Sequence, residues 1–498
     1  MVLSALLLIG SVAPAIEFLT PPVLSEASIQ SARALEARAA RSPNAYNFRI
    51  LADAYLAVQK YQAASGAFMK ASELYRKAGD PNAAEVLLSY AKRYETTIRV
   101  FVEEPLNETW AKRYYSGAKF EPLYGCLVGV NNERDAERDP EAFDRRVGKK
   151  HATFFMYRSF GTPFPSALAA QLREMKAGLQ IAWEPKSLEE MDDPDIVSDF
   201  AEAASRSGIP IFLRFASEMN GPWTRYSGNP SVYRQKFRNV ARMVHEIAPN
   251  VAMVWCPNET PKEPIDNYYP GPEAVDWVGV NFYSVLYNDG DRSRAAEWRH
   301  PADSLDYIYA KYSARHPIMV GEWAATHHSV LDPAPKPQFA RTKIGQFYAA
   351  LPRLYPRVKA VHWLSMDTMT HASGPRKLNN FSLLDDASVA AKYRDVLADG
   401  YFLESMTTDE VQPSQKQYVL LKPNATLPYG ARLSLVVRSY EQEPVVTVLL
   451  GGTQLLEQRE VDDYRFTVSS VGKAQLRVTV RDSYGRIASE LKMPISVK

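Results

Sequence analysis

Between residues 118 and 403, short apolar runs alternate with longer amphipathic segments. The runs predict eight strands, at 123–130, 152–157, 179–183, 211–216, 251–255, 277–282, 318–321 and 358–364. Most are followed by a stretch with helical periodicity, such as 231–247 or 338–351. Strands that alternate with helices predict a parallel sheet, and eight such units predict an α/β fold of the (β/α)8, or TIM-barrel, type. Its active site is expected at the carboxyl ends of the strands.

The segment before this barrel, residues 27–100, has a helical pattern. Apolar and small residues follow the spacing of a tetratricopeptide repeat, in which small side chains let antiparallel helices pack closely: Phe48, Leu51, Ala52, Tyr55, Ala64, Phe68 and Ala71. Gly79, Asp80 and Pro81 predict the end of one helix and the start of another. The segment resembles one tetratricopeptide repeat with a further helix. Two roles stay open for it, a hairpin that packs on the next domain and a module that binds a protein partner.

From residue 413 to 498 the helical pattern gives way to strict alternation. Apolar residues recur at every second position in two series: Leu433, Leu435 and Val437, then Leu476, Val478 and Val480. Turn pairs such as Gly451-Gly452 separate the runs. This pattern predicts a small C-terminal β-sandwich. A spacer role and sugar binding both stay open for it.

Composition narrows the function classes. The 498 residues carry a formal net charge of +2, which indicates neither a nucleic acid nor a strongly acidic partner. The two cysteines, Cys126 and Cys256, are too few for a disulfide framework, and buried free thiols are expected in their apolar runs. Residues 1–20 hold a short apolar run before a small-residue stretch, which predicts a signal peptide and an exported, periplasmic or extracellular protein. A misassigned start and an ordinary buried helix are the other interpretations of that run.

Two glutamates carry the predicted chemistry. Glu218 and Glu322 directly follow the fourth and seventh predicted strands, so both are expected at the same end of the barrel. A retaining glycosidase needs such a pair, one carboxyl as acid/base and one as nucleophile, roughly 5–5.5 Å apart. The other interpretation is that each glutamate only accepts hydrogen bonds at a strand end.

Tryptophan side chains gather at the same predicted edge. Five of them lie at or just after strand ends, where aromatic faces would suit the apolar faces of sugar rings: Trp183, Trp223, Trp255, Trp323 and Trp363. Packing in the core is the alternative for any single one of them. We expect these rings to line a polysaccharide-binding rim.

Several motifs together make the barrel similar to glycoside hydrolase family 26, a family of β-mannanases and related enzymes. They are RFASEMNGPW at 214–223, VGE at 320–322, IAWEP at 181–185, VWCPN at 254–258 and DWVGVNFY at 276–283. The resemblance covers roughly residues 120–400 and reaches neither the helical nor the β-rich end. It implies a (β/α)8 barrel, in agreement with the strand pattern.

The resemblance also implies roles for single residues. Glu218 would be the general acid/base, Glu322 the nucleophile, and Tyr283 a hydrogen-bond donor to that nucleophile. Trp363 would be an aromatic platform under the sugar at the cleavage point. Arg214 is expected to pair with a carboxylate or to serve the structure. Weaker matches add further substrate contacts at Trp183, Asn220 and Trp223. No metal ion or cofactor is implied.

One position departs from the family pattern. The family usually has histidine immediately before the acid/base, and this chain has Ser217, whose hydroxyl is shorter and does not titrate in the same range. Ser217 therefore casts doubt on mannan specificity more than on glycoside hydrolysis. The leading hypothesis is a retaining hydrolase of β-linked polysaccharide, mannan-like before others. Two alternatives stay open, a hydrolase tied to exopolysaccharide synthesis or export and a carbohydrate-binding protein without catalysis.

Overall fold

The computed structural model describes residues 24–132, 138–294, 298–406, 415–441, 443–459 and 463–498. The predicted signal peptide, residues 1–20, lies outside this range. Among the helices that are described, none combines the length and the apolar character needed to cross a membrane. The chain forms two compact units, Met1–Glu95 with Arg481–Ala488 and Thr96–Val480 with Ser489–Lys498.

The described residues of the first unit form four helices: α1 Glu26–Arg41, α2 Ala45–Ala57, α3 Tyr61–Lys77 and α4 Pro81–Tyr94. Small side chains fill the contacts between them, and Ala52, Ala64 and Ala71 are fully buried. The predicted break between α3 and α4 is confirmed, because Gly79 has a φ of +82° and the Asp80 side chain caps α4. The repeat class of these helices stays a prediction.

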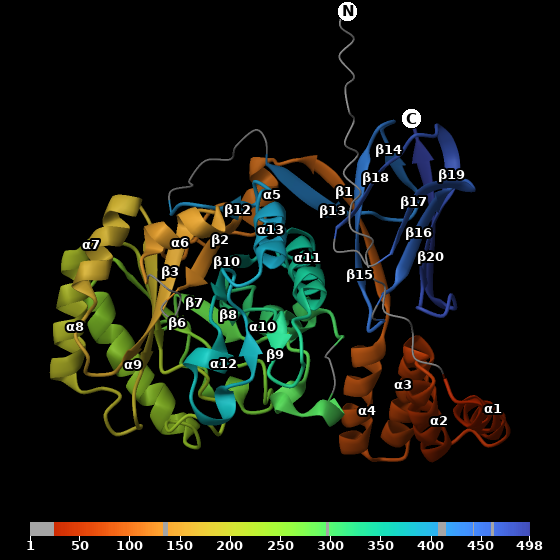
Figure 1. Cartoon of the computed structure of the whole chain (residues 1–498), viewed down its shortest axis with the longest axis horizontal. Helices are drawn as coiled ribbons and strands as arrows, with labels where there is room; N and C mark the ends of the chain where they lie inside the picture. Colours follow the sequence, from red (N-terminus) through yellow and green to blue (C-terminus); the bar gives the residue numbers. More distant parts are fainter. Residues whose placement is uncertain (1–23, 133–137, 295–297, 407–414, 442, 460–462) are drawn as a thin grey trace, which may run out of the picture. The chain divides into compact units, whose positions relative to one another are not determined.

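Eight parallel strands form a closed barrel in the second unit (Figure 1). They are β2 Cys126–Asn131, β3 Thr153–Ser159, β4 Gly178–Glu184, β5 Ile211–Phe215, β6 Val251–Trp255, β7 Trp277–Asn281, β8 Ile318–Trp323 and β10 Val358–Leu364. Neighbours pair in sequence order, and β10 pairs with β2 to close the ring. All eight predicted strands and the TIM-barrel fold are confirmed.

Helices surround the barrel: α6 Pro140–Val147, α7 Ser166–Met175, α8 Pro194–Ser207, α9 Pro230–Ile247, α10 Asp306–Tyr312, α11 Pro337–Leu354 and α13 Ala387–Val396. The predicted helices at 231–247 and 338–351 correspond to α9 and α11. Shorter elements complete this region: α5 Glu108–Arg113, α12 Thr368–His371, β9 His328–Ser329, β11 Asn379–Asn380 and β12 Phe402–Leu403.

Side chains alternate along the barrel strands between two layers. Phe212, Val254 and Met319 belong to a cluster inside the barrel, whereas Leu213 and Met253 belong to the larger cluster between barrel and helices. Since successive side chains of a strand point to opposite faces, this parity decides which residue at a strand end faces the site.

The remaining strands form two further sheets. The strands after the barrel are β13 Lys416–Leu420, β14 Ala425–Leu427, β15 Arg432–Arg438, β16 Val445–Leu450, β17 Thr453–Arg459, β18 Tyr464–Thr467, β19 Gly472–Arg481 and β20 Ile487–Val497. One sheet has the order β13-β1-β15-β18 and the other β14-β20-β19-β16-β17. The first includes a strand from before the barrel, β1 Thr97–Pro105, which pairs antiparallel with β13 and β15.

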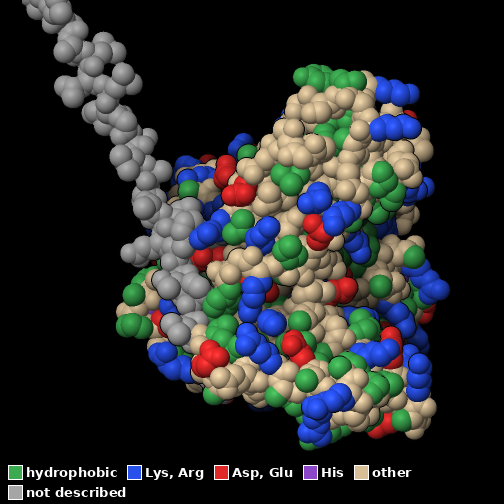
Figure 2. All heavy atoms as spheres, turned by 90° about the vertical axis from the view of Figure 1, so that its right-hand side faces the viewer, with side chains coloured by type: hydrophobic (Ala, Val, Ile, Leu, Met, Phe, Trp, Pro, Cys, Tyr) green, Lys and Arg blue, Asp and Glu red, His purple; other side chains and the backbone are tan. Residues whose placement is uncertain are grey.

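Charged side chains are mixed on the face drawn in Figure 2. Lys and Arg side chains lie among Asp, Glu and apolar ones on the described part of that face. This distribution agrees with the net charge of +2.

Candidate active site

A one-residue bulge in β8 turns Glu322 into the barrel. Val320 pairs with Val280 of β7, yet the next pair joins Glu322 to Asn281. Gly321 is therefore an extra residue in β8. A shift of one residue moves every following side chain to the opposite face of a strand. Glu322 accordingly faces the interior, and only 5% of its surface is exposed.

Two donors hold the Glu322 carboxylate. Arg214 Nη2 donates to Oε1, and the Tyr283 hydroxyl donates to Oε2. Arg214 is fully buried on β5. Burial is the largest single effect and lowers the pKa of Arg214, but Glu322, Cys256, Tyr157 and Glu184 together outweigh it and raise the pKa well above its usual value. A buried guanidinium requires an anion beside it, and Glu322 supplies that charge.

Tyrosine hydroxyls around Glu322 keep their protons. Burial first, and then the negative charge of Glu322, raises the pKa of Tyr283 well above its usual value. The same two causes raise the pKa of Tyr157, although 40% of this side chain is exposed. Both side chains are therefore donors rather than acids at neutral pH.

Glu218 follows β5 on a turn with left-handed backbone. The φ angle is +45° at Ala216 and +57° at Glu218, a region that residues other than glycine rarely adopt. Ala216 N donates to Trp183 O at 3.0 Å, and Glu218 N donates to Cys256 O at 2.8 Å. The Tyr233 hydroxyl donates to Ala216 O at 3.0 Å. Such strained backbone persists only where the surroundings enforce it, and it is concentrated at functional sites.

Neutral donors surround the Glu218 carboxylate. Asn281 Nδ2 and Asn258 Nδ2 donate to Oε1 at 2.8 and 3.1 Å. Trp223 Nε1 donates to Oε2 at 2.7 Å. Glu218 thus accepts hydrogen bonds from neutral amide and indole N–H groups, whereas Glu322 accepts one from a charged guanidinium.

Asn281, at the end of β7, connects the two carboxylates. Its Nδ2 reaches Glu218, while its Oδ1 accepts from Arg214 Nη1 at 3.2 Å and from Cys256 Sγ at 3.1 Å. Asn281 was not among the site residues predicted from the sequence. Its position along β7 could have identified it, because residues two apart on a strand face the same side. Gly279 faces the interior, and Asn281 lies two residues further along the same strand.

Ser217 lies against a third carboxylate, Glu184, at the end of β4. Ser217 Oγ donates to Glu184 Oε1 at 2.5 Å and Ser217 N donates to Oε2 at 3.1 Å. Tyr226 Oη lies 2.5 Å from Glu184 Oε2. Burial is the main cause that raises the pKa of Glu184. Glu184 was not among the predicted site residues, although it directly follows the predicted strand 179–183 and lies next to Trp183.

Four of the tryptophans expected on the rim lie in the core instead. The side chains of Trp183, Trp255, Trp323 and Trp363 are completely buried. Trp183 stacks on Phe200 with ring centroids 4.2 Å apart. These tryptophans belong to the cluster between barrel and helices. The structure corrects the expected rim, because a ring without an exposed face offers no surface to a sugar.

Trp223 and Asn220 lie beside Glu218 in different ways. Trp223 is 48% exposed and contacts the Glu218 carboxylate directly. Asn220 is buried, and its Nδ2 donates to Asn258 O at 2.9 Å and Pro261 O at 2.8 Å. Its Oδ1 accepts from Asn258 N at 2.9 Å. Asn220 therefore holds Asn258, which in turn contacts Glu218.

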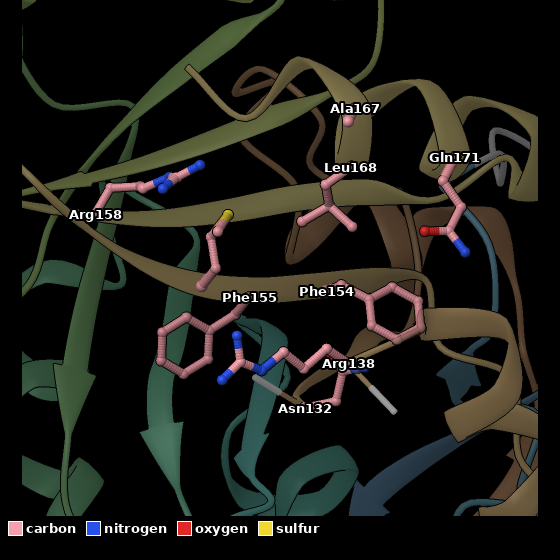
Figure 3. Close-up of a pocket in the computed structure, with 9 residues that line it drawn as sticks. Asn132, Arg138, Phe154, Phe155, Arg158, Ala167, Leu168 and Gln171 are labelled. Carbon is pink, nitrogen blue, oxygen red and sulfur yellow. The ribbon is translucent and has the colours of Figure 1, made fainter. Parts of the chain in front are cut away.

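A cavity of about 450 Å³ lies beside the ends of β2 and β3 (Figure 3). Phe154, Phe155 and side chains of α7 line it together with Asn132, Arg138 and Arg158. Phe155 also lies under Arg214, whose guanidinium is 5.0 Å from the ring centroid. The predicted site residues do not line this cavity.

Known proteins match the barrel region. Residues 186–298 match the family model described as glycosyl hydrolase family 26. A segment of 97 residues is 34% identical to a β-1,3-xylanase of Alcaligenes sp. and one of the same length is 35% identical to β-1,3-xylanase TXYA of Vibrio sp.. Each match covers 18% of this chain and 20% of the relative. The chain thus spans about a fifth of the length of the curated relatives it matches.

Solved structures of the same family are similar at a lower level. GH26A from Muricauda sp. is 16% identical, with 56% of this chain and 91% of that chain covered and a TM-score of 0.35. The family 26 domain of an endo-β-mannanase/endo-β-glucanase from Prevotella bryantii is 10% identical, with 59% and 93% covered and a TM-score of 0.37. These values are too low to carry an assignment, which depends on the sequence matches. The part of the barrel that matches glycosyl hydrolase family 26 is thus residues 186–298, and the barrel is similar to that family.

Proposed function

We propose that the protein is a retaining glycoside hydrolase of β-linked polysaccharide, with Glu322 as nucleophile and Glu218 as general acid/base. The contrast between their partners supports these roles. Glu322 is paired with a buried guanidinium, whereas Glu218 receives only neutral donors. A nucleophile must be ionised, and an acid must hold and release a proton. The family resemblance agrees with this division.

The reaction proceeds in two displacements. Glu322 attacks the anomeric carbon while Glu218 gives its proton to the glycosidic oxygen, so that the bond to the leaving sugar breaks and an ester to Glu322 forms. Glu218 then takes a proton from water, the water oxygen attacks the anomeric carbon, and the ester breaks. Arg214 and Tyr283 stabilise the released carboxylate.

A β-mannan is the substrate that the family resemblance favours. A β-1,3-xylan is the second candidate, because two relatives are named β-1,3-xylanases. Asn220 is buried and holds Asn258. Trp223 is the exposed tryptophan beside Glu218, so we place Trp223 against the sugar. Ser217 is a substrate contact only if a sugar displaces its bond to Glu184.

Export, and a protein partner for the four N-terminal helices, are also proposals. The helical unit motivates a link to exopolysaccharide synthesis or export, since helical repeats frequently bind partners. A pull-down with the full chain from its own host would test this link. Absence of any polysaccharide-synthesis protein from the bound fraction would contradict it.

Product analysis tests the enzymatic proposal. The purified protein is incubated with β-mannan and β-1,3-xylan in parallel, and proton NMR follows the anomeric configuration of the first product. We expect the β anomer to appear first, no turnover in Glu322→Gln, and a loss of about 10²–10⁴-fold in Glu218→Ala. Binding without product release would instead favour a carbohydrate-binding protein.

A further inference from the structure

Glu184, Ser217 and Tyr226 form a closed hydrogen-bonded group directly before the acid/base. Glu184 accepts from both the backbone N and the side-chain Oγ of Ser217. Tyr226 Oη lies 2.5 Å from Glu184 Oε2 and 2.6 Å from Ser217 O. The proposed function leaves this group without a role.

The protons of this group can be counted. Ser217 O is a carbonyl oxygen and only accepts, so the single Tyr226 proton belongs in that bond. The contact between Tyr226 Oη and Glu184 Oε2 then needs a proton from the other side. A neutral Glu184 supplies it: its O–H at Oε2 donates to Tyr226, its Oε1 accepts from Ser217 Oγ, and the oxygen of the O–H group still accepts from Ser217 N.

The group holds the middle of a strained turn. Ala216 and Glu218, on either side of Ser217, both have positive φ angles. Left-handed backbone at non-glycine residues is unfavourable and persists only where contacts enforce it. Glu184 binds Ser217 at two atoms, and Tyr226 binds its carbonyl oxygen. These contacts hold Ser217 in place, and Ser217 is the residue directly before Glu218.

We infer that Glu184 is a positioning residue, held as a neutral carboxylic acid that clamps Ser217 and thereby aims Glu218 at the glycosidic oxygen. This inference rests on the proposed function only in taking Glu218 as the acid/base. It also gives Ser217 a role: its short hydroxyl leaves room for Glu184 at the place where the family usually has histidine.

Charged and titratable groups face Glu184 from each neighbouring element. Arg214 on β5 and the hydrogen bonds with Ser217 and Tyr226 favour its ionised form, whereas burial and Glu218 oppose ionisation; burial is the largest effect, and the pKa of Glu184 is raised. Tyr226 and Tyr233 face it as well, with pKa values raised by burial and by Glu184 itself. A neutral Glu184 avoids a further buried negative charge beside Glu218, which agrees with the proton count.

Kinetics of three variants test the role. Glu184→Ala is expected to lose about 10²-fold in kcat/KM on polysaccharide, because a misaimed acid forfeits much of its contribution. On an aryl glycoside with a good leaving group, azide should restore turnover in Glu184→Ala as in Glu218→Ala, since azide attacks the ester without base catalysis. Glu184→Gln, which can donate to Tyr226, should lose less than about tenfold. Glu174→Gln, exposed on α7, is the matched control.

Each other outcome of these assays overturns the inference. Azide would not rescue Glu184→Ala if Glu184 only stabilised the fold. If Glu184 acted as an ionised carboxylate, Glu184→Gln would fall as far as Glu184→Ala. A wild-type protein that hydrolyses none of the polysaccharides contradicts the proposed function instead, and the protonation of Glu184 is then decided by the next measurement.

Stability against pH tests protonation without any turnover. A pKa raised by folding means that the folded chain binds more protons than the unfolded chain, so stability falls as pH rises above the unfolded value of about 4.3. Glu184→Gln lacks this loss. The Tm of the wild type minus that of Glu184→Gln should therefore decrease from pH 4 upward, and an infrared difference spectrum should show a protonated carboxyl band. A constant or rising Tm difference would overturn the inference.

Discussion

Asn281 donates from Nδ2 to Oε1 of Glu218 at 2.8 Å, and with this bond it ties the proposed acid/base to the Arg214 side of the site. The amide cannot turn over without facing its NH2 group to Arg214 and its oxygen to Glu218. Asn281 thus fixes which group Glu218 meets, and an isosteric change at this position alters charge with little change in shape.

Asn281→Asp is expected to slow the reaction. The change removes the amide donor to Glu218 Oε1 and places a second carboxylate beside the proposed acid/base. The kcat/KM on polysaccharide should therefore fall by about tenfold or more, because Glu218 loses a hydrogen bond that orients it. Asn239→Asp, exposed on α9, is the control, and an unchanged kcat/KM in Asn281→Asp would contradict the prediction.

Gly321→Ala is expected to disrupt the bulge that turns Glu322 inward. A Cβ atom at residue 321 would lie 2.7 Å from Asn281 Oδ1, 3.0 Å from Cys256 Sγ and 3.1 Å from Arg214 Nη1. Because these atoms are buried and hydrogen-bonded, the variant should lose about 1–3 kcal/mol of unfolding free energy and most of its activity. Urea denaturation and kcat measure the two effects.

Gly66→Ala is the control for that substitution. Nothing lies within 4 Å of a Cβ atom at this position in α3, so stability should hold or rise by about 0.5–1 kcal/mol. Equal behaviour of the two glycine variants would show that the bulge tolerates a side chain.

The barrel strands could be predicted from sequence because each is an apolar run that ends in a turn or loop. The predicted run 318–321 ended before Glu322, whereas β8 extends to Trp323. The bulge at Gly321 leaves no trace in hydrophobic periodicity, since it exists only relative to the neighbouring strands. Pairing of β1 with β13 and β15 was likewise hidden, because its partners lie more than 300 residues away.

Arg214→Leu is expected to destabilise the fold as well as the reaction. The change leaves the Glu322 charge buried without its cation, which costs about 3–5 kcal/mol. Adding Glu322→Gln removes the orphaned charge, so the double variant should be more stable than Arg214→Leu alone. Urea denaturation of both single variants and the double variant gives the coupling energy. Simple additivity of the two losses would contradict the pairing of Arg214 with Glu322.

The site residues differ in how far the neighbouring sequence alone can identify them. Glu218 and Glu322 could be found because each follows a predicted strand. Glu184 and Asn281 have the same kind of signal, but their value depends on contacts with residues from other strands. The tryptophans were expected on the rim because they lie at strand ends, but this expectation ignored which face of the strand each side chain points to. Glu322 faces inward, so Trp323 faces the helices.

Trp223 and Trp183 should therefore respond in opposite ways to truncation. Trp223→Ala removes an exposed ring and its 2.7 Å bond to Glu218, so we expect a fall in kcat/KM of about tenfold or more with little change in Tm. Trp183→Ala empties a fully buried site stacked on Phe200 and should cost about 3–5 kcal/mol of unfolding free energy. Trp223→Phe keeps the ring without the N–H and separates the two contributions. If Trp183→Ala were as stable as the wild type and Trp223→Ala were fully active, the prediction would be contradicted. The sugar contact would then be assigned to the tryptophans at the strand ends.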